Sequence, residues 1–529
     1  MLEKVQADRQ VKLEQIRALG IDPYGVRHDT NEAIASIMGR YKDDAPPAPA
    51  DAAGRLVLLR NMGKLVFAHL RDQTGQMQVA FRKNAIDEKS WQLINLLDMG
   101  DLIAVSGPVQ RTKTGEITIW AERVTLLCKS LNPMPEKFHG LKDVEIRYRQ
   151  RYLDLMTYPE VMAVFRRRTA IIECLRRLLN ARGFCEVETP VLQAIYGGAA
   201  AKPFVTHHNA LDADLFLRIS PELYLKRLLV GGMERVYEFS RNFRNEGIDT
   251  RHNPEFTLLE LYQAYGDYDV MMEITEELIA TAARDIAVPA LLAEAQAWNK
   301  RLESLAASED PAVKASADSE AVEAAPVLQA AAQCRDGRIV LPYGQILIDY
   351  TRPWRRAKYA DLFAQHAGVS MADMPGVRAK ARQLHIDEAG RDDAVVINDV
   401  LEATVEKHLV QPTFVMDYPA ALCPLTRRKS DDPNTALRFE CFIANMEVGN
   451  AYTELNDPAV QEANFLQQVQ GEAKDETMRV MDEDFVTALR HGMPPAGGLG
   501  IGIDRVIMLL CNRQSIRDVV LIPQLRKQQ

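Results

Sequence analysis

The spacing of apolar residues near the start of the chain predicts a helix. Over residues 3–19, apolar side chains recur at helical spacing, and Gly20 and Pro23 would end the helix. The lysines and arginines between them could contact an RNA backbone, although a solvated helix face explains them at least equally well. Residues 43–54, rich in Ala, Asp and Pro, are expected to form a linker or loop.

Five alternating apolar and polar runs follow this segment and predict a small β-domain. Turn signals separate the runs, and one helical stretch, residues 89–97, lies between the third and the fourth. This order is typical of an OB-fold, a barrel that commonly binds single-stranded nucleic acid. A barrel that only packs against its neighbour would show the same pattern. The runs span residues 55–61, 64–72, 76–82, 101–110 and 116–127.

Helical and strand patterns mix irregularly in the remainder of the chain. Residues 161–182 show the periodicity of a long amphipathic helix, which Gly183 would end. From there to about residue 285 the strict alternation of a doubly wound sheet is missing, so the expected class is α+β. Residues 287–335 are rich in Ala and Glu with little aromatic content, and we expect an exposed helical or flexible insertion without chemistry.

Two expected strands, "ERVYEFSRNFRNE" and "PEFTLLELYQAY", would place charged and aromatic side chains on one surface. Alternation puts Arg244 on the polar face of the first strand, and Phe256, Glu260 and Tyr262 on a common face of the second. If the strands pair, the guanidinium could grip a phosphate or carboxylate, the ring could stack on a base, and the acid and phenol could bind an ammonium. A surface hairpin with exposed ion pairs is the alternative.

A glycine-rich run, "GGLGIGIDRVIMLL", predicts an extended segment followed by an apolar helix that begins near Asp504. It matches neither the Rossmann nor the P-loop signature. Glycines allow a ligand to approach the backbone closely, and Arg505 in the first helical turn could face polyphosphate. A buried glycine strand packed on a helix would look the same.

The segment "RFECFIANMEVGNAYTELND" carries three glutamates spaced seven apart. A hairpin around residues 444–445 would bring Glu440 and Glu447 together, where they could hold Mg²⁺ between protein oxygens and phosphates. Glu454 has the same parity as Asn450, so these two could line one pocket. Simple ion pairing of the acids remains possible.

The composition narrows the class of protein. The chain has 529 residues, 47% of them hydrophobic, and a net charge of −9, which argues against a surface coated in basic residues but not against local binding of nucleic acid. Its seven cysteines show no CxxC pair, as expected for reduced thiols in the cytoplasm. The charged N-terminus is unlike a signal peptide, and no apolar run approaches the ~18 residues of a membrane span.

The three segments together resemble the signature motifs of the class II aminoacyl-tRNA synthetases, most closely the lysyl-tRNA synthetases. "FRNEG…RHNPEFT…ELY" is similar to motif 2, "GLGIGIDR" to motif 3, and the helix at 161–182 with "GFCEVETPVL" to motif 1, a dimer-interface element. "RISPELYLKRLLVGG" and "GNAYTELND" make the resemblance specific to lysine. The match runs through most of the chain, and only the 287–335 insertion lies outside it.

The resemblance implies an anticodon-binding unit over residues 1–140, with the N-terminal helix and the OB-fold barrel. Residues 141–529 would be a class II catalytic domain, an antiparallel sheet flanked by helices, with the insertion at about 287–335. The implied activity is a lysine–tRNA ligase that forms lysyl-adenylate from lysine and ATP with Mg²⁺ and transfers lysine to the 3′ end of tRNA(Lys). A cytoplasmic homodimer is expected.

The resemblance also assigns roles to residues. Arg244 and Arg505 would be catalytic, and Glu440 and Glu447 would bind Mg²⁺. The implied ATP contacts are Arg244, Glu246, Arg251, His252, Asn253, Phe256, Glu440 and Arg505. The implied lysine contacts are Gly198, Glu222, Arg244, Glu260, Tyr262, Asn450 and Glu454, with Tyr262 and Glu454 at the ε-ammonium. The implied anticodon contacts are Arg60, Phe67 and Glu116.

Three alternatives stay open at this level. An aspartate or asparagine enzyme shares the barrel and motifs, but its pocket would need a cation or amide where this chain carries acids. A relative that lysylates an elongation factor lacks the barrel. A non-catalytic RNA-binding protein would have lost ATP-site residues, and none is visibly lost. Leu59 departs from the family pattern, since many relatives carry a second arginine there.

Overall fold

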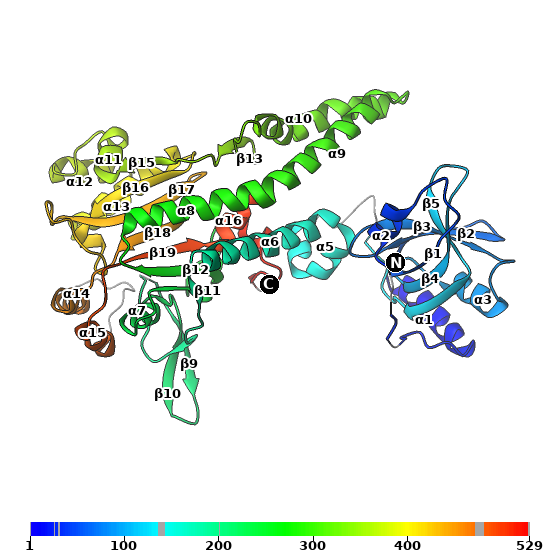
Figure 1. Ribbon diagram of the computed structural model, residues 1–529, viewed down its shortest axis with the longest axis horizontal. Helices are drawn as coiled ribbons and strands as arrows, with labels where there is room; N and C mark the ends of the chain where they lie inside the picture. The colour runs from blue at the N-terminus through cyan, green and yellow to red at the C-terminus, as the bar shows by residue number, and fades with distance from the viewer. Residues whose placement is uncertain are drawn as a thin grey trace. The chain divides into compact units, whose positions relative to one another are not determined.

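The computed structural model (Figure 1) describes residues 2–25, 27–29, 32–135, 143–199, 201–470 and 481–526. Contacts within the chain divide it into two compact units, Met1–Val144 and Glu145–Gln529. The domain boundary expected between residues 140 and 141 lies outside the described residues.

The first unit is a closed barrel with helices around it. Strand β1 pairs with both β2 and β4, which closes the strand order β1-β2-β3-β5-β4-β6, and α3 follows β3. This is the OB-fold expected from the alternating runs. The elements are α1 Leu2–Ala18, α2 Ile34–Arg40, β1 Pro49–Asn61, β2 Leu65–Arg71, β3 Gln76–Arg82, α3 Glu88–Leu96, β4 Leu102–Arg111, β5 Ile117–Ala121 and β6 Arg123–Cys128.

Two details of the barrel differ from the sequence-based expectation. The expected linker at 43–54 is strand from Pro49 onward, because the small residues Ala50 and Ala52 are buried in the barrel interior. A Cβ at Gly54 would lie 2.4 Å from the carbonyl oxygen of Arg71, so the strand crosses its neighbour too closely for a side chain. The run 116–127 is two strands, β5 and β6, separated at Glu122.

The N-terminal helix α1 is anchored to the barrel by its basic residues. Arg9 is buried and donates hydrogen bonds to the carbonyl oxygens of Met99, Ser130 and Asn132. Lys12 forms an ion pair with Asp98, Nζ to Oδ1 2.6 Å. These two contacts tie α1 to the barrel.

The second unit is built on an eight-stranded sheet in the order β15-β16-β17-β18-β19-β12-β11-β7. The six central strands pair antiparallel and the two outermost pairs are parallel. This arrangement confirms the α+β class. The strands are β7 Cys185–Glu186, β11 Arg235–Phe243, β12 Glu255–Ala264, β15 Arg355–Lys358, β16 Thr413–Pro419, β17 Thr435–Ile443, β18 Met446–Thr453 and β19 Ala496–Gly502.

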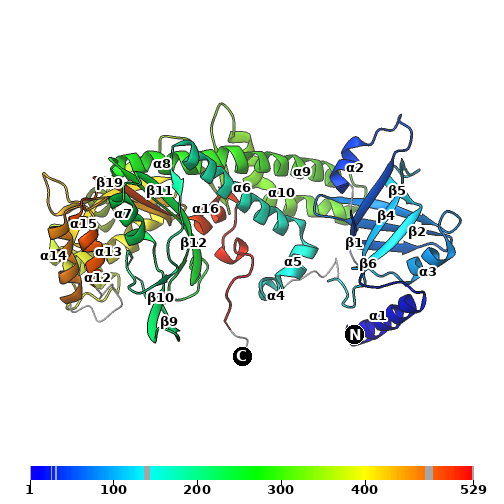
Figure 2. The ribbon, with the colours of Figure 1, turned by 60° about the horizontal axis from the view of Figure 1, so that its bottom comes forward.

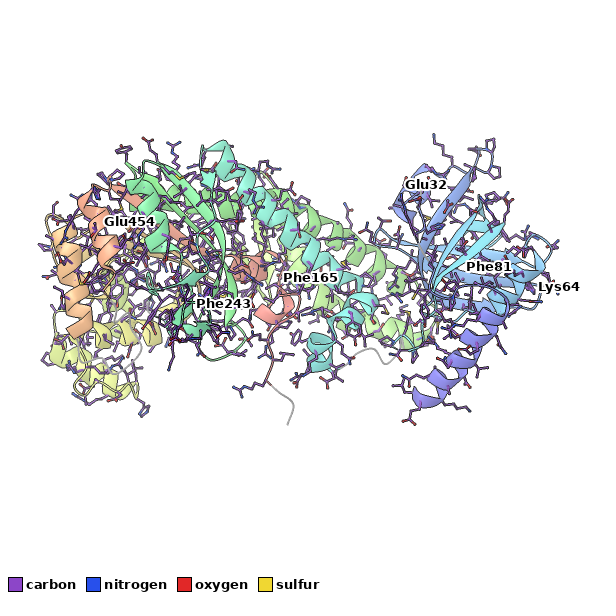
Figure 3. The ribbon with its side chains drawn as sticks, turned by 90° about the horizontal axis from the view of Figure 1, so that it is seen from below. Glu32, Lys64, Phe81, Phe165, Phe243 and Glu454 are labelled. Carbon is purple, nitrogen blue, oxygen red and sulfur yellow. The ribbon has the colours of Figure 1, made fainter. Side chains whose placement is uncertain are left out.

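Three helices cover one face of this sheet (Figures 1 and 2): α6 Pro159–Ala181, α8 Tyr268–Ala282 and α16 Ile503–Leu510. Their apolar sides form the main core with the sheet, in which Ile171, Leu278 and Ile507 are almost fully buried. Figure 3 shows Phe165, another buried residue, on α6. The opposite face of the central strands, which carries polar side chains, is left to line a cavity.

Smaller elements surround the sheet. A small three-stranded sheet has the order β8-β10-β9, and its β9 and β10 project from the unit (Figure 2). Helix α7 packs against β11 and β12. The remaining elements are α4 Val144–Arg149, α5 Arg151–Thr157, β8 Leu192–Gln193, β9 Phe204–His208, β10 Ala213–Leu217, α7 Glu222–Val230, β13 Val340–Tyr343, β14 Ile346–Asp349, α11 Tyr359–Ala367, α12 Met374–Gln383, α13 Asp393–Thr404, α14 Pro458–Gln470 and α15 Glu483–Arg490.

The Ala- and Glu-rich segment forms two long helices that lie side by side (Figure 1), α9 Val288–Ala306 and α10 Pro311–Gln333. A short π-helical stretch, Ala283–Ala287, joins α9 to α8. Of the two expected forms, helical or flexible, the insertion takes the helical one, and the expectation that it is exposed is corrected at its base, where Ala295 and Val327 pack into the main core. Alanine allows two helices to approach closely, which is why a segment with few large residues still forms this hairpin.

Among the helices that the structure describes, none combines the length and the hydropathy that crossing a bilayer requires.

Candidate active site

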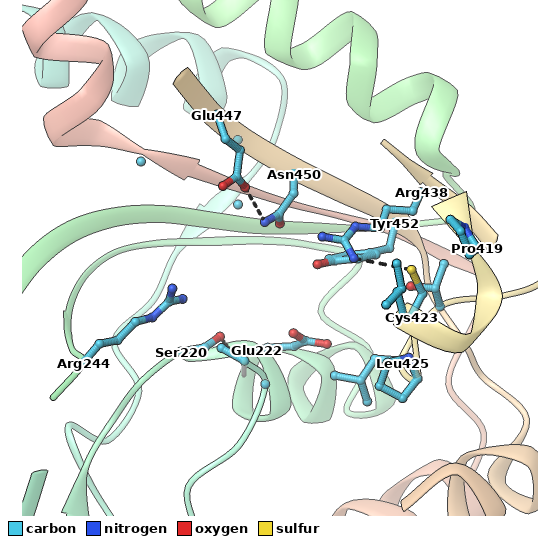
Figure 4. A pocket seen from close by; sticks show the side chains of 18 of the residues that line it. Ser220, Glu222, Arg244, Pro419, Cys423, Leu425, Arg438, Glu447, Asn450 and Tyr452 are labelled. Atoms are coloured by element: carbon cyan, nitrogen blue, oxygen red, sulfur yellow. Dashed lines mark hydrogen bonds between the residues drawn. The ribbon is translucent and has the colours of Figure 1, made fainter. Parts of the chain in front are cut away.

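A cavity of about 1460 Å³ opens on the polar face of the central strands. Figure 4 shows Arg244, Ser220 and Glu222 on one side, with Glu447, Asn450 and Arg438 facing them across the space. Its far part is lined by α13 and by the segment 419–426. The cavity therefore combines a charged half on the sheet with a more apolar half.

Strand pairing brings Arg244 and Phe256 to the cavity as the alternation predicts. Asn242 lies opposite Phe256 in the β11–β12 pair, and the backbone N–H of Arg244 donates to the carbonyl oxygen of Pro254 at 2.8 Å. The guanidinium carbon lies 5.2 Å from the centre of the Phe256 ring. Arg244 Nε is buried and has no hydrogen-bond partner among the described residues, so the side chain can still bind an anion.

A second group of cations lies along the same edge of the cavity. Arg505 Nη1 donates to the carbonyl oxygen of Glu447 at 2.6 Å, and its Nη2 lies 2.9 Å from His252 Nε2. Arg251 donates to the carbonyl oxygen of Asn445 at 3.0 Å. Arg251 is held by Asn445, and Arg505 by Glu447 and His252, while both arginines line the cavity, as a polyphosphate site needs.

Asp504 fixes the helix that carries Arg505. Its buried carboxylate accepts from Arg168 Nη1 on α6 at 2.6 Å and from the backbone N–H of Thr257 on β12 at 2.7 Å. The two contacts tie α16 to α6 and to the sheet, so Arg505 projects from a rigid base.

Glu260 and Tyr262 lie on the floor of the cavity. The Tyr262 hydroxyl donates to Glu260 Oε1 at 2.7 Å, and the Ser220 hydroxyl donates to Oε2 at 3.1 Å. Burial raises the pKa of Glu260 to about 8, and the negative charge of Glu222 adds to the increase. A carboxyl group in this state becomes a strong acceptor when a cation arrives.

Glu222 and Glu454 share a buried cation of the protein, Lys226. Its Nζ lies 2.6 Å from Glu222 Oε1 and 2.5 Å from Glu454 Oε2. Burial raises the pKa of Glu454 to about 8, Lys226 opposes the increase and Glu222 adds to it. Glu454 Oε1 is buried without a hydrogen-bond donor in the part of the chain that the structure describes.

Two glycines make room for these acids. A Cβ at Gly498 would lie 2.0 Å from Glu454 Oε1 and 2.5 Å from a ring carbon of Tyr262. Gly198 has φ of +84°, and a Cβ there would lie 2.8 Å from the Cβ of Glu222. Both positions therefore require glycine if the acids are to stay where they are.

The acids expected to bind metal lie at different depths. Glu447 lines the cavity, and its Oε1 accepts from Asn450 Nδ2 at 3.0 Å. Glu440 lies behind the wall, where Tyr418 donates to its Oε2 at 2.8 Å and Arg438 pairs with its Oε1. Burial raises the pKa of Glu440, Arg438 opposes this, and the charge of Glu447 raises it further. Within the described residues, no group of three potential ligands forms a ready metal site.

Most of the residues singled out in the sequence meet at this one cavity. Glu440 and Glu454 do not line it; Glu454 is buried and pairs with Lys226. The sequence reasoning missed Ser220, Lys226, Arg438 and Tyr452; only Lys226 gave a signal, four residues after Glu222 on one helix. The expected residues that line the cavity are Gly198, Glu222, Arg244, Glu246, Arg251, His252, Asn253, Phe256, Glu260, Tyr262, Glu447, Asn450 and Arg505.

Two of the three residues expected to contact the anticodon are direct neighbours in the barrel. Arg60 on β1 is the direct register partner of Phe67 on β2. Glu116 pairs instead with neighbours, accepting from Gln78 Nε2 at 2.7 Å and lying 3.0 Å from His69 Nε2. Phe67 meets Trp120 edge to face at 6.3 Å, and both rings are only half-buried. The rings could stack on bases.

Comparison with known proteins agrees with this architecture. The family model for tRNA synthetases class II (D, K and N) matches residues 143–526, and the model for the OB-fold nucleic acid binding domain matches residues 52–127. Both matches are consistent with the fold described above.

Individual relatives carry the same likeness along nearly the whole chain. A lysine–tRNA ligase of Pelotomaculum thermopropionicum is 46% identical over 534 residues, covering 99% of this chain and 95% of the relative. A lysine–tRNA ligase of Moorella thermoacetica is 45% identical over 527 residues, with 99% and 98% covered. One of Carboxydothermus hydrogenoformans is 44% identical, with 98% and 97% covered. With this likeness and this fold, the chain belongs to the lysine–tRNA ligase family of the class II aminoacyl-tRNA synthetases.

Proposed function

We propose that the chain activates lysine with ATP and transfers it to the 3′ end of tRNA(Lys). The observation that carries this proposal is the arrangement of the cavity, in which Arg244 lies at one end and buried carboxylates lie at the other. Arg244 suits the α-phosphate and the substrate carboxylate together. The acids suit the two ammonium groups of lysine. An aspartate or asparagine substrate would place a carboxylate or amide against these acids, which is unfavourable.

The chemistry requires positioning more than proton transfer. A carboxylate oxygen of lysine attacks the α-phosphorus of ATP, the bond to the bridging oxygen breaks, and pyrophosphate leaves with that electron pair. Arg244 holds both reactants, Phe256 stacks on adenine and Glu246 accepts from its amino group. Arg251, His252 and Arg505 hold the outer phosphates. Neutralising charge at fixed positions is the main catalytic contribution.

The second step uses the same cavity. The terminal ribose hydroxyl of tRNA attacks the carbonyl carbon of lysyl-adenylate, loses its proton, and AMP leaves with the bonding electrons.

The proposed contacts of lysine are divided among its three charged groups. Gly198 and Glu222 would hold the α-amino group, Asn450 the carboxylate, and Tyr262 with Glu454 the ε-ammonium, with Glu260 beside them. The unpartnered Glu454 Oε1 supports the last assignment.

Mg²⁺ fits this site as a partner of ATP. Glu447 offers hard oxygen ligands in the cavity, and Glu440 would have to leave Tyr418 or Arg438 to share the ion. Burial, and after it the charge of Glu447, raises the pKa of Glu440, and a shared cation would relieve the repulsion between the two acids. Two protein carboxylates suffice when phosphate oxygens and waters complete the shell. Mg²⁺ would neutralise charge on the leaving pyrophosphate.

The barrel would recognise the anticodon through Arg60, Phe67 and Glu116. Single-stranded bases can stack on exposed rings, and the edges of the bases can donate hydrogen bonds to acids.

We further propose that the chain forms a homodimer through α6 and its neighbouring strand, and that it is cytoplasmic. Both proposals rest on family resemblance.

Amino-acid-dependent exchange of pyrophosphate into ATP tests the proposed function. Across the standard amino acids, lysine should support exchange and aspartate and asparagine should not. Charging of tRNA(Lys) with radiolabelled lysine should follow. Exchange that depends on aspartate would end the proposal, and lysine transfer to a protein but not to tRNA would restrict it.

Lysine binding is expected to release about one to two protons at pH 7, because Glu260 and Glu454 hold protons there and an arriving ammonium favours their charged forms. Titration calorimetry in buffers with different ionisation enthalpies measures the number. The release should vanish by pH 9, above both pKa values.

The raised pKa values of Glu260 and Glu454 also predict how the stability of the protein depends on pH. In the lysine-free protein, these groups contribute stability below the ordinary pKa of a glutamate, and the contribution is lost as pH rises through about 8. Lysine should therefore raise the melting temperature more at pH 8.5 than at pH 6. Equal stabilisation at both values, with no proton release at pH 7, would contradict the carboxyl assignment.

Phe67→Ala should raise the KM for tRNA by about 10- to 100-fold, the loss of one base stack. Lysine-dependent pyrophosphate exchange should not change, since Phe67 lies in the barrel unit. Steady-state charging of tRNA measures the first effect, and the pyrophosphate exchange assay measures the second. Lys64→Ala, at an exposed position directly before β2, is a control for surface change. An unchanged KM for Phe67→Ala would remove Phe67 from anticodon binding.

A further inference from the structure

We propose that Lys226 is a specificity-determining positioning residue, whose buried ammonium bridges Glu222 and Glu454 so that the pocket accepts a substrate with two separate ammonium groups. The inference rests on the proposed function, since it concerns how the same pocket selects lysine. Lys226 does not line the cavity, so it acts through the two acids.

The geometry shows one cation between two acids from distant parts of the chain. Lys226 and Glu222 lie one turn apart on α7, whereas Glu454 follows β18. The Lys226 side chain is fully buried, at 2.6 Å from Glu222 and 2.5 Å from Glu454. Tyr262 lies beside it, with the ring centre 5.9 Å from Nζ. The charged and titratable groups around Lys226 are thus Glu222 from α7, Glu454 after β18, and Tyr262 with Glu260 from β12.

Charge balance explains what the bridge accomplishes. Glu222, Glu260 and Glu454 together with Lys226 carry a net charge of −2 when all four side chains are ionised. Lysine brings two ammonium groups, and its carboxylate is matched separately by Arg244. The occupied pocket is then neutral, which a buried site needs. Without Lys226 the acids would carry one negative charge too many, and a proton on Glu222 or Glu454 would weaken the binding of substrate.

The bridge also limits what Glu454 can recognise. Lys226 Nζ lies 2.5 Å from Oε2 in an ion pair, whereas Oε1 has neither an ion-pair partner nor a hydrogen-bond donor among the described residues. A single ammonium can use one oxygen, whereas a guanidinium pairs best with both oxygens of a carboxylate. The arrangement therefore favours lysine over arginine.

A purely structural role explains the bridge less well. Buried ion pairs usually contribute little net stability, because desolvation offsets the attraction, and apolar residues of similar volume are often tolerated in their place. Burying a second acid from a distant segment costs free energy, and so does leaving one of its oxygens without a hydrogen-bond donor. A purely structural contact would avoid both costs.

Lys226→Met tests the proposal, because methionine keeps most of the side-chain volume and removes the charge. In lysine-dependent exchange, the KM for lysine should rise at least about 30-fold, as when one partner of a buried charge pair is lost. The KM for ATP should stay within about twofold. The pH at which the KM for lysine reaches its minimum should move upward, and selectivity for lysine over arginine should fall.

Arg227→Met is the matched control, since it removes a cation from the next position of α7 that pairs with Asp482 outside the pocket. It should leave the KM for lysine unchanged. Lys226→Gln serves if the methionine variant does not fold, because it keeps a hydrogen-bond donor without the charge. A KM and pH profile like those of the unmodified protein would overturn the proposal, and so would loss of folding in both Lys226 variants.

The outcomes separate this inference from the proposed function. If the unmodified protein shows no lysine-dependent exchange, the proposed function fails. If it shows exchange and the Lys226 variants match it, only the role of Lys226 fails.

Discussion

Arg244→Ala should lower lysine-dependent pyrophosphate exchange by about 10³-fold or more, the scale of removing an arginine that stabilises a phosphoryl-transfer transition state. Arg244 is the cation placed to contact both reactants, and its Nε lacks a partner in the described protein, so its removal breaks no internal hydrogen bond of that atom. The fold should remain, since the strand pairing around it uses the backbone.

The matched control for this variant is Arg241→Ala. Arg241 lies three residues earlier on β11, is exposed, does not line the cavity, and pairs with Glu255 and Thr257. Circular dichroism and the melting temperature of both variants establish that they fold. Exchange that persists in folded Arg244→Ala would show that another group bridges ATP and lysine.

Gly498→Ala is expected to lower the rate of exchange at limiting lysine by about 100-fold, as overpacking of a few kcal/mol would do. The new Cβ would lie 2.0 Å from Glu454 Oε1 and 2.5 Å from Tyr262, so the two side chains proposed to hold the ε-ammonium must move. The loss should appear mainly in the KM for lysine.

Gly502→Ala provides the comparison on the same strand, because its Cβ would have no neighbour closer than 3.7 Å. Its effect on the KM for lysine should be at least about tenfold smaller. Equal effects of the two substitutions would mean that the glycines serve the strand in general and not the space beside Glu454.

The pairing of β11 with β12 could be predicted because it depends on local alternation. Arg244, Phe256, Glu260 and Tyr262 follow the two-residue period of a strand, and the structure places all four at one cavity. The hairpin at Ala444 and Asn445, whose φ values are both positive, was likewise visible from the sequence.

Other features depend on contacts between distant segments, which single-sequence patterns do not contain. The strand from Pro49 was hidden because its Ala and Pro residues favour a loop, and only the barrel interior selects small side chains there. The deep position of Glu440 follows from Tyr418 and Arg438. Lys226 lies in an obvious helix, but its second partner, Glu454, is more than 200 residues away.

The central claim is that buried acids capture the ε-ammonium of lysine opposite Arg244. Exchange with lysine compared with norleucine, whose side chain is that of lysine without the terminal ammonium, tests it most directly. A site built around a charged contact should prefer lysine by about 10⁴-fold in kcat/KM. Norleucine activated within tenfold of lysine would contradict the claim.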